Sequence, residues 1–181
     1  MESTEKDFAV RKALAWIACH KLKSVWSSTL KRNLKVRIFL ATVESVLLFG
    51  SETWTFTKSM EKQLNGVYTR LLRMALGVTW RQHLTNEELY QDLPLVSSKV
   101  RERRLRLAGH CMRHEDEEAN KLVLWEPTEG KASRGRQKVT YIDNLKRDTG
   151  LEDTAEIKTI MQDRGRWTGI VTCARTKVRP R

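Results

Sequence analysis

Three observations predict an all-α fold for this chain of 181 residues. Only three prolines are present, at Pro94, Pro127 and Pro180, so long stretches of backbone are free to be helical. Apolar residues recur at helical spacing in several successive segments. Thr85 and Glu88 stand at the spacing of a capping box, which marks the start of a helix. We therefore expect a protein built from many helices, without an internal repeat or a heptad array.

The first half of the chain contains three predicted helices, over residues 5–22, 31–49 and about 58–76. In the second of these, one apolar stripe consists of Val36, Phe39, Leu40, Val43, Val46 and Leu47. The end of that helix is apolar nearly all round, which places it in the middle of a core. The third helix carries a stripe of Leu64, Val67, Tyr68, Leu71, Leu72 and Ala75. Gly77 stops it, and GSETWTF (50–56) is predicted to be a turn or a short extended piece.

The second half of the chain predicts shorter helices around one loop. A short helix follows Thr85 and ends before Pro94, another covers about 97–113, and a further one covers about 115–125. The acids at its start, EDEE (115–118), suit the positive end of the helix dipole. EPTEGKASRGRQK (126–138) is a flexible loop, and two or three more helices fit between Thr140 and Arg175. A seam near 78–84 divides the chain into predicted domains at 1–80 and 81–181.

Composition points to a polyanionic partner. Hydrophobic residues make up 40% of the chain and charged residues 31%, which describes a folded protein. The formal net charge is +12, an excess that favours nucleic acid or an acidic membrane surface. A basic protein whose charge serves only solubility is the alternative.

The cysteines and the chain start predict an intracellular protein, nuclear or cytoplasmic and not secreted. Cys19, Cys111 and Cys173 are odd in number and lack CxxC spacing, which argues against a disulfide framework and a zinc knuckle. MESTEKDFAVRK is too polar for a signal peptide. The most apolar run, 38–50, is too short to span a bilayer and carries Glu44, so no membrane partner is expected.

The stretch RRLRLAGHCMRH (103–114) could hold a metal, act as a nucleophile, or bind a polyanion. At about 100° per residue, one broad arc contains Val100, Leu105, Leu107, Ala108, Cys111 and Met112. The opposite side contains Arg103, Arg106, His110 and Arg113. Cys111 thus points into the core, about a quarter-turn from His110. His110 and His114, at i and i+4, could meet a metal together but have no third ligand at a diagnostic distance, so neither a zinc site nor a Cys–His pair is predicted. His110 either makes a polar contact beside the arginines or ties this helix to a neighbour.

Cations gather in four separate segments, which predicts phosphate contacts spread along a duplex. No acid occurs between Phe8 and Val43, and Trp16, His20 and Trp26 are interleaved with the cations there. Residues 99–113 carry six cations against Glu102, the loop 126–138 is basic, and the tail after Asp163 lacks acids. The predicted nucleic-acid contacts are Lys21, Lys23, Lys31, Arg32, Lys35, Arg103, Arg106, His110, Arg113, Arg134, Arg136 and Lys138. The glycine in SRGRQK would let backbone amides approach a phosphate.

Missing motifs predict that the chain is not an enzyme by itself. It contains no adjacent Asp-Asp pair, no GxxxxGK[ST] loop, no HExxH and no GxSxG. Two-metal phosphoryl transfer needs clustered carboxylates, and none is evident. We expect no catalytic residues, no bound metal and no cofactor.

Five ordered blocks resemble one protein family and cover the chain from about Lys6 to Ile170. They read ACHKLKSVWSSTLKRNLKVRIFLATVESVLLFGSETWT, EKQLNGVYTRLLRMALGV, RRLRLAGHCMRH, RGRQKVTYIDNLKRDTGL and DRGRW. They look like the thumb and C-terminal region of the endonuclease–reverse transcriptases of non-LTR retrotransposons, of the RTE or jockey-like type. This resemblance implies a thumb-like helical bundle followed by a small basic helical domain.

The matched blocks assign several residues to family motifs. Phe49, Gly50, Glu52 and Trp54 would belong to the thumb, and Gly109, His110 and Arg113 fall on a GHxxR block. Gly135 and Arg136 fall on a GRP block, and Asp163, Arg164 and Trp167 on a DRxxW block. Gln137 stands where the family usually has Pro, and Leu107 where it often has Trp.

The resemblance implies a non-catalytic part of an RNA-directed DNA polymerase that holds template–primer or element RNA. The family's palm, with its catalytic aspartates, lies upstream of such a region, so upstream polymerase domains are partners if the chain is part of a longer one. RNA, RNA–DNA hybrid and DNA all fit the predicted contacts. The alternative is a free-standing helical interaction protein derived from a retrotransposon fragment, with no polymerase role.

Overall fold

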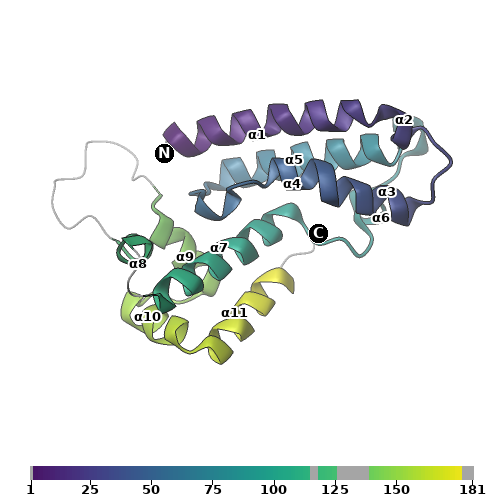
Figure 1. The fold of residues 1–181 in the computed structure, drawn as a ribbon. Coiled ribbons are helices and arrows are strands. Elements are labelled where there is room, and N and C mark those ends of the chain that lie inside the picture. Colours follow the sequence, from purple (N-terminus) through teal and green to yellow (C-terminus); the bar gives the residue numbers. More distant parts are fainter. Residues whose placement is uncertain (1, 115–117, 126–138, 177–181) are drawn as a thin grey trace. The chain divides into compact units, whose positions relative to one another are not determined.

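The structure is a computed structural model that describes residues 2–114, 118–125 and 139–176 (Figure 1). Every regular element in these ranges is a helix and none is a strand, which confirms the predicted all-α class. The chain separates into two compact units. Among the described residues, unit 1 joins Lys58–Ser97 to the chain up to Gly50, and unit 2 joins Ser51–Thr57 to the residues from Ser98 to Thr176. The sequence had suggested a division between residues 80 and 81.

Unit 1 is built around two long helices. Its elements are α1 (Glu2–Lys21), α2 (Lys23–Trp26), α3 (Arg32–Phe39), η1 (Leu40–Glu44), α4 (Ser45–Leu47), α5 (Lys58–Ala75), η3 (Trp80–Gln82) and α6 (Asn86–Tyr90). α1 packs along α4 and α5 (Figure 1). The buried side chains of this core include Ala15, Cys19, Phe39, Leu47, Leu64, Leu71 and Leu72. The helices predicted at 5–22 and 58–76 are therefore present with nearly the expected bounds.

The helix predicted over 31–49 contains a π turn that the sequence reading did not foresee. Between α3 and α4 the backbone forms η1, one turn of π-helix over Leu40–Glu44. Thr42 Oγ1 donates to the Ile38 carbonyl at 2.7 Å, and Ser45 Oγ donates to the Ala41 carbonyl at 2.8 Å. Hydroxyls that bond back to preceding carbonyls are known to bend helices. The turn buries Glu44, whose carboxylate accepts a hydrogen bond of 2.6 Å from the Tyr68 hydroxyl.

Local signals end and restart the helices of unit 1 as predicted. Gly77 adopts a φ of 67°, which suits glycine in the left-handed region. The amides of Gly77 and Val78 donate to the carbonyls of Met74 and Arg73, the pattern of a Schellman motif. The capping box at Thr85 is formed, because the Glu88 amide donates to Thr85 Oγ1 and the Thr85 amide donates to the Glu88 carboxylate.

Unit 2 is a second helical core. Its elements are η2 (Ser51–Thr53), α7 (Val96–Arg113, whose first two residues belong to unit 1), α8 (Glu118–Val123), α9 (Tyr141–Thr149), α10 (Thr154–Gln162) and α11 (Arg164–Thr176). α11 packs against α9 and α10. The buried core of unit 2 includes Leu105, Ala108, Cys111, Met112, Leu145, Ile157, Met161 and Trp167.

The predicted apolar arc of α7 is confirmed. Val100, Leu105, Ala108, Cys111 and Met112 are all buried, and Leu107 packs against the same core. Of the acidic stretch 115–118 the structure describes Glu118 alone, as the first residue of α8, and the rest lies outside the described residues.

Candidate nucleic-acid interface

Three of the predicted lysine contacts are exposed in the connection that leads from α1 through α2 to α3, which we call the lysine turn. Lys21 ends α1, Lys23 begins α2, and Lys31 directly precedes α3. All three side chains are exposed. Because the surrounding sequence from Phe8 to Val43 contains no acid, this segment has a high local density of positive charge. Long flexible ammonium side chains of this kind suit contacts with phosphate oxygens.

Two other predicted contacts, Arg32 and Lys35, also make structural bonds. The Arg32 guanidinium donates to the Leu89 carbonyl at 2.6 Å and to Gln91 Oε1 at 3.0 Å. Lys35 Nζ donates to the Trp26 carbonyl at 2.6 Å. Both side chains are partly buried. They therefore hold α3 against its surroundings, which leaves fewer of their donors for an external ligand.

The aromatic residues among these cations contribute mainly to packing. Trp26 is 4% exposed, and its indole Nε1 donates to the Cys19 carbonyl at 2.8 Å. Trp16 is partly buried, with its ring centroid 6.0 Å from that of His20. Trp26 is thus not accessible to a base.

The cations of α7 are exposed to different extents. Arg106 is exposed and forms an ion pair of 2.7 Å with Glu102, one turn earlier. Arg103 is partly buried. His110 lies on the polar side, as predicted, with its ring centroid 4.3 Å from that of His114. Arg106 and His110 are therefore accessible to a phosphate.

Arg113 has a structural contact that the sequence did not suggest. Its Nη1 donates to the Met161 carbonyl at 3.0 Å, near the end of α10. A cation near a helix C-terminus satisfies a carbonyl that the helix leaves open and interacts favourably with the helix dipole. The side chain is partly buried. Arg113 thus joins α7 to α10 and is not simply a surface cation.

The GHxxR and DRxxW blocks meet in unit 2. The Trp167 indole donates to the Leu105 carbonyl at 2.9 Å and lies so close to α7 that a Cβ on Gly109 would stand 2.2 Å from its Nε1. Only glycine leaves room for that ring. Asp163 accepts hydrogen bonds from the amides of Gly165 and Arg166 at the start of α11, and so holds the helix that carries the tryptophan. These two blocks therefore serve to pack α11 on α7.

The three predicted contacts of the loop, Arg134, Arg136 and Lys138, lie outside the described residues. The same holds for Gly135 and Gln137.

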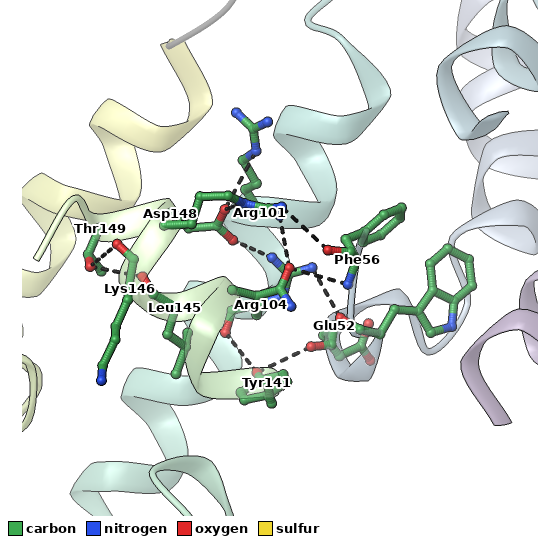
Figure 2. Close-up of polar contacts among 12 residues, drawn as sticks. Glu52, Phe56, Arg101, Arg104, Tyr141, Leu145, Lys146, Asp148 and Thr149 are labelled. Carbon is green, nitrogen blue, oxygen red and sulfur yellow. Dashed lines mark hydrogen bonds and ion pairs between the residues drawn. The ribbon is translucent and has the colours of Figure 1, made fainter. Parts of the chain in front are cut away.

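A buried arginine, Arg104, forms the polar centre of unit 2 (Figure 2). Its guanidinium is 0% exposed and pairs with Asp148, whose side chain is 1% exposed. It also donates to the Trp54 carbonyl at 3.1 Å. Arg101 and Arg147 each place Nε 3.6 Å from the other oxygen of Asp148. Burial lowers the pKa of Arg104 and the Asp148 charge acts against that effect. Two partly exposed arginines thus converge on one neutralised, buried pair.

The segment Ser51–Thr57 is held to α9 by the same network. The Tyr141 hydroxyl donates to the Glu52 carbonyl at 3.2 Å, and the Phe56 amide donates to Asn144 Oδ1 at 3.2 Å. Arg147 donates to the same Asn144 oxygen at 2.8 Å. Trp54 and Phe56 are buried beside these bonds. The predicted turn at 50–56 therefore has a precise packing role in unit 2.

Arg104 was missed because its charge suggested a surface position. Helical spacing carried the signal, since Arg104 lies four residues after Val100 and four before Ala108, on the apolar arc. A cation on a core arc indicates a buried pair, but its partner Asp148 is 44 residues away in the chain.

The described part of the chain holds neither a cluster of metal ligands nor a helix that could span a membrane. Residues 2–114, 118–125 and 139–176 contain no group of three or more His, Cys, Asp and Glu side chains arranged to hold a metal ion. Across the same ranges, the helices are too short or too polar to cross a bilayer.

Comparison with known proteins finds a relative of this chain. The chain is 27% identical over 173 residues to a protein of Caenorhabditis elegans that is described as uncharacterized and transposon-derived. The aligned region covers 89% of this chain and 62% of that protein, so the chain spans less than two thirds of the relative's length. No protein-family model matches the chain. No solved structure matches it either.

Proposed function

We propose that this chain is a nucleic-acid-binding part of a mobile-element reverse transcriptase, and that it holds template–primer or element RNA through backbone phosphates. It performs no catalysis itself. RNA, RNA–DNA hybrid and DNA are its candidate ligands. Binding depends on the shape and charge of the duplex rather than on its base sequence.

The observation that carries this proposal is the exposed lysine turn of unit 1. Lys21, Lys23 and Lys31 project from the ends of consecutive helices within a stretch, 8–43, that lacks acids. Each phosphate that such a cation neutralises releases condensed counterions, which favours binding without base contacts. On α7, Arg106 and His110 add exposed polar groups of the same kind.

Origin in a mobile element is supported by the C. elegans relative, which is itself described as transposon-derived. The finer assignment to the thumb and C-terminal region of a reverse transcriptase depends on the five sequence blocks. Two of these blocks also contact one another in the structure, where the Trp167 ring leaves no room for a side chain at Gly109.

The absence of clustered carboxylates in the sequence supports a non-catalytic role. We expect the purified chain to leave a primer on an RNA template unextended when dNTPs and Mg²⁺ or Mn²⁺ are supplied. Extension by material free of contaminating polymerase would contradict this part of the proposal.

Binding can be tested by titrating a labelled RNA–DNA hybrid with the full chain over a series of salt concentrations. We expect affinity to fall steeply and linearly on a log–log scale as salt rises. The triple variant Lys21→Ala, Lys23→Ala, Lys31→Ala should bind more weakly. Its salt slope should be smaller by about one for each phosphate that the variant no longer neutralises.

A matched control is Lys158→Ala, since Lys158 is also exposed but lies on α10 within a few residues of Glu152, Asp153 and Glu156. This variant should bind almost as the unmodified chain does. An affinity for the hybrid that stays constant between low and physiological salt would rule out the phosphate-contact proposal.

One observation favours a second function, a helical interaction protein without a polymerase role. Val10, Leu14 and Ile17 follow one another at helical spacing on α1 and are 54%, 40% and 52% exposed. A row of exposed apolar side chains is typical of protein contacts. If the chain binds neither hybrid nor duplex RNA at low salt, and Leu14→Gln abolishes its retention by a protein partner, this second function holds.

A further inference from the structure

Trp80 is the most exposed of the large apolar side chains in the described ranges. Its side chain is 78% exposed, whereas Trp26 and Trp54 are 4% and 2% exposed. An indole that stays in water forgoes the large gain that burial offers. Folding therefore does not explain why a tryptophan stands at this position.

The turn that carries Trp80 is held on both sides. It forms the short helix η3, in which the Thr79 amide donates to Gln82 Oε1 at 3.0 Å and the Gln82 amide donates to the Thr79 carbonyl at 3.2 Å. The Schellman motif at Gly77 precedes it. On the other side, Arg73 of α5 donates to the Leu84 carbonyl at 2.6 Å and to Asn86 Oδ1 at 3.1 Å. The ring is thus presented from an ordered backbone, which lowers the entropy cost of binding.

A cation lies beside the Trp80 ring. The Arg81 guanidinium carbon lies 5.7 Å from the centroid of the Trp80 ring, within the range of a cation–π contact. Between Glu61 and Glu87 the sequence contains Lys62, Arg70, Arg73 and Arg81 and no acid. Arg70, Arg81 and His83 are all exposed. A flat aromatic face with a cation beside it suits a ligand that combines a planar ring with negative charge.

From these features we infer that Trp80 is a stacking platform for an unpaired nucleobase, with Arg81 beside it to contact the base or the adjacent phosphate. Proteins that bind single-stranded nucleic acid combine aromatic side chains with basic grooves in this way. Stacking accepts any base, because every base has a π face. The inference rests on the proposed function and deepens it, since it adds single-strand binding to the duplex contacts of the lysine turn.

The test uses the full chain and two labelled single-stranded oligonucleotides of equal length, one with bases and one in which every nucleotide is abasic. Both carry the same phosphates, so only the first can stack. We expect the unmodified chain to bind the oligonucleotide with bases roughly 5- to 150-fold more tightly, the range that base–aromatic stacking spans. Trp80→Ala should remove most of that ratio, and Trp80→Phe should keep much of it.

Trp125→Ala is the matched control, because Trp125 is 61% exposed but belongs to unit 2. It should keep the full ratio. If Trp80→Ala leaves the ratio unchanged, the stacking inference is wrong, and a contact with a protein partner becomes the better explanation of the exposed ring.

Failure of the inference can be distinguished from failure of the proposed function. In the first case the chain still binds RNA–DNA hybrid with a steep salt dependence, but the two single strands bind alike or Trp80→Ala leaves their affinity ratio unchanged. In the second case it binds none of these ligands at low salt, which overturns both proposals.

Discussion

The indole of Trp167 lies directly on the backbone of Gly109. Its nearest ring atoms, Nε1 and Cδ1, would stand 2.2 and 2.4 Å from a Cβ at that position. The ring is held there by its hydrogen bond to the Leu105 carbonyl, and the Trp167 side chain is buried, with an exposed fraction of 2%. Glycine inside a helix is less stabilising than alanine. At position 109, however, the missing side chain makes possible the contact that joins α11 to α7.

Gly109→Ala should destabilise the chain by about 1–3 kcal/mol, because the new methyl group and the indole cannot share the space. The urea midpoint of unfolding measures this change. Gly169→Ala is the control, since a Cβ there meets no atom within 4 Å. It should raise the free energy of unfolding by roughly 0.5–1 kcal/mol, the usual gain when alanine replaces glycine inside a helix. Equal effects of the two substitutions would contradict the predicted steric role.

Asp148→Asn should cost about 3–5 kcal/mol of stability, because it leaves the fully buried Arg104 guanidinium without its counter-charge. Adding Arg104→Met removes that charge, so the double variant should be more stable than Asp148→Asn alone. Denaturant unfolding of both single variants and the double variant gives the coupling energy. A coupling energy near zero would show that the pair adds no specific stabilisation.

Alkaline pH should destabilise the chain through its three tyrosines. The pKa of Tyr68 is raised well above its ordinary value of 10, mainly because the phenol is buried and also because the Glu44 carboxylate lies beside it. Burial also raises the pKa of Tyr90 and that of Tyr141. The folded chain therefore keeps phenolic protons that the unfolded chain releases above about pH 10. Stability should be complete below about pH 10 and fall as the pH rises beyond it.

Ionisation of the tyrosines can be measured by tyrosinate absorbance as the pH is raised. This absorbance should increase together with the loss of the helical circular dichroism signal, and not at a lower pH. Tyr68→Phe should make the alkaline loss of stability shallower. At neutral pH the same substitution should cost about 1–3 kcal/mol, because the buried Glu44 carboxylate loses its donor at 2.6 Å. Normal titration of all three phenols in the folded chain would refute the prediction.

Binding and stability should respond separately to two sets of cations. Arg103→Ala with Arg106→Ala should weaken nucleic-acid binding and lower the salt slope, with a smaller effect on unfolding. Arg113→Ala should lower stability by roughly 1.5–3 kcal/mol, since it removes a charged donor from the Met161 carbonyl. Hybrid titrations and thermal unfolding of the same variants provide the comparison. If Arg113→Ala alters only affinity, its assigned structural role is incorrect.

The thiols should react in the order of their exposure. Cys173 is exposed, whereas Cys19 and Cys111 are buried and burial raises the pKa of Cys19. A thiol-specific reagent should modify Cys173 quickly in the folded chain and the other two only on unfolding. Cys111→Ala should cost about 1 kcal/mol and leave affinity for the hybrid unchanged. Rapid reaction of Cys111 in the folded chain would contradict its position in the core.

Much of the helical architecture could be predicted because its signals are local. The stripe of α5, the stop at Gly77, the capping box of Thr85 and the inward side of Cys111 each depend on residues within one or two turns. The burial of Glu44 at the end of the π turn escaped prediction, because its hydrogen-bond partner Tyr68 lies 24 residues further along.

The sequence by itself determined the all-α class, the positions of most helices and a surplus of positive charge, since periodicity, capping and composition are properties of short segments. Only the tertiary structure decided which cations remain available. Arg104 and Arg113 carry the same charge as Arg106, yet the first is buried against Asp148 and the second is bonded to the Met161 carbonyl. These partners lie 44 and 48 residues away in the chain. The availability of a charged group depends on contacts between distant segments, and no local pattern encodes them.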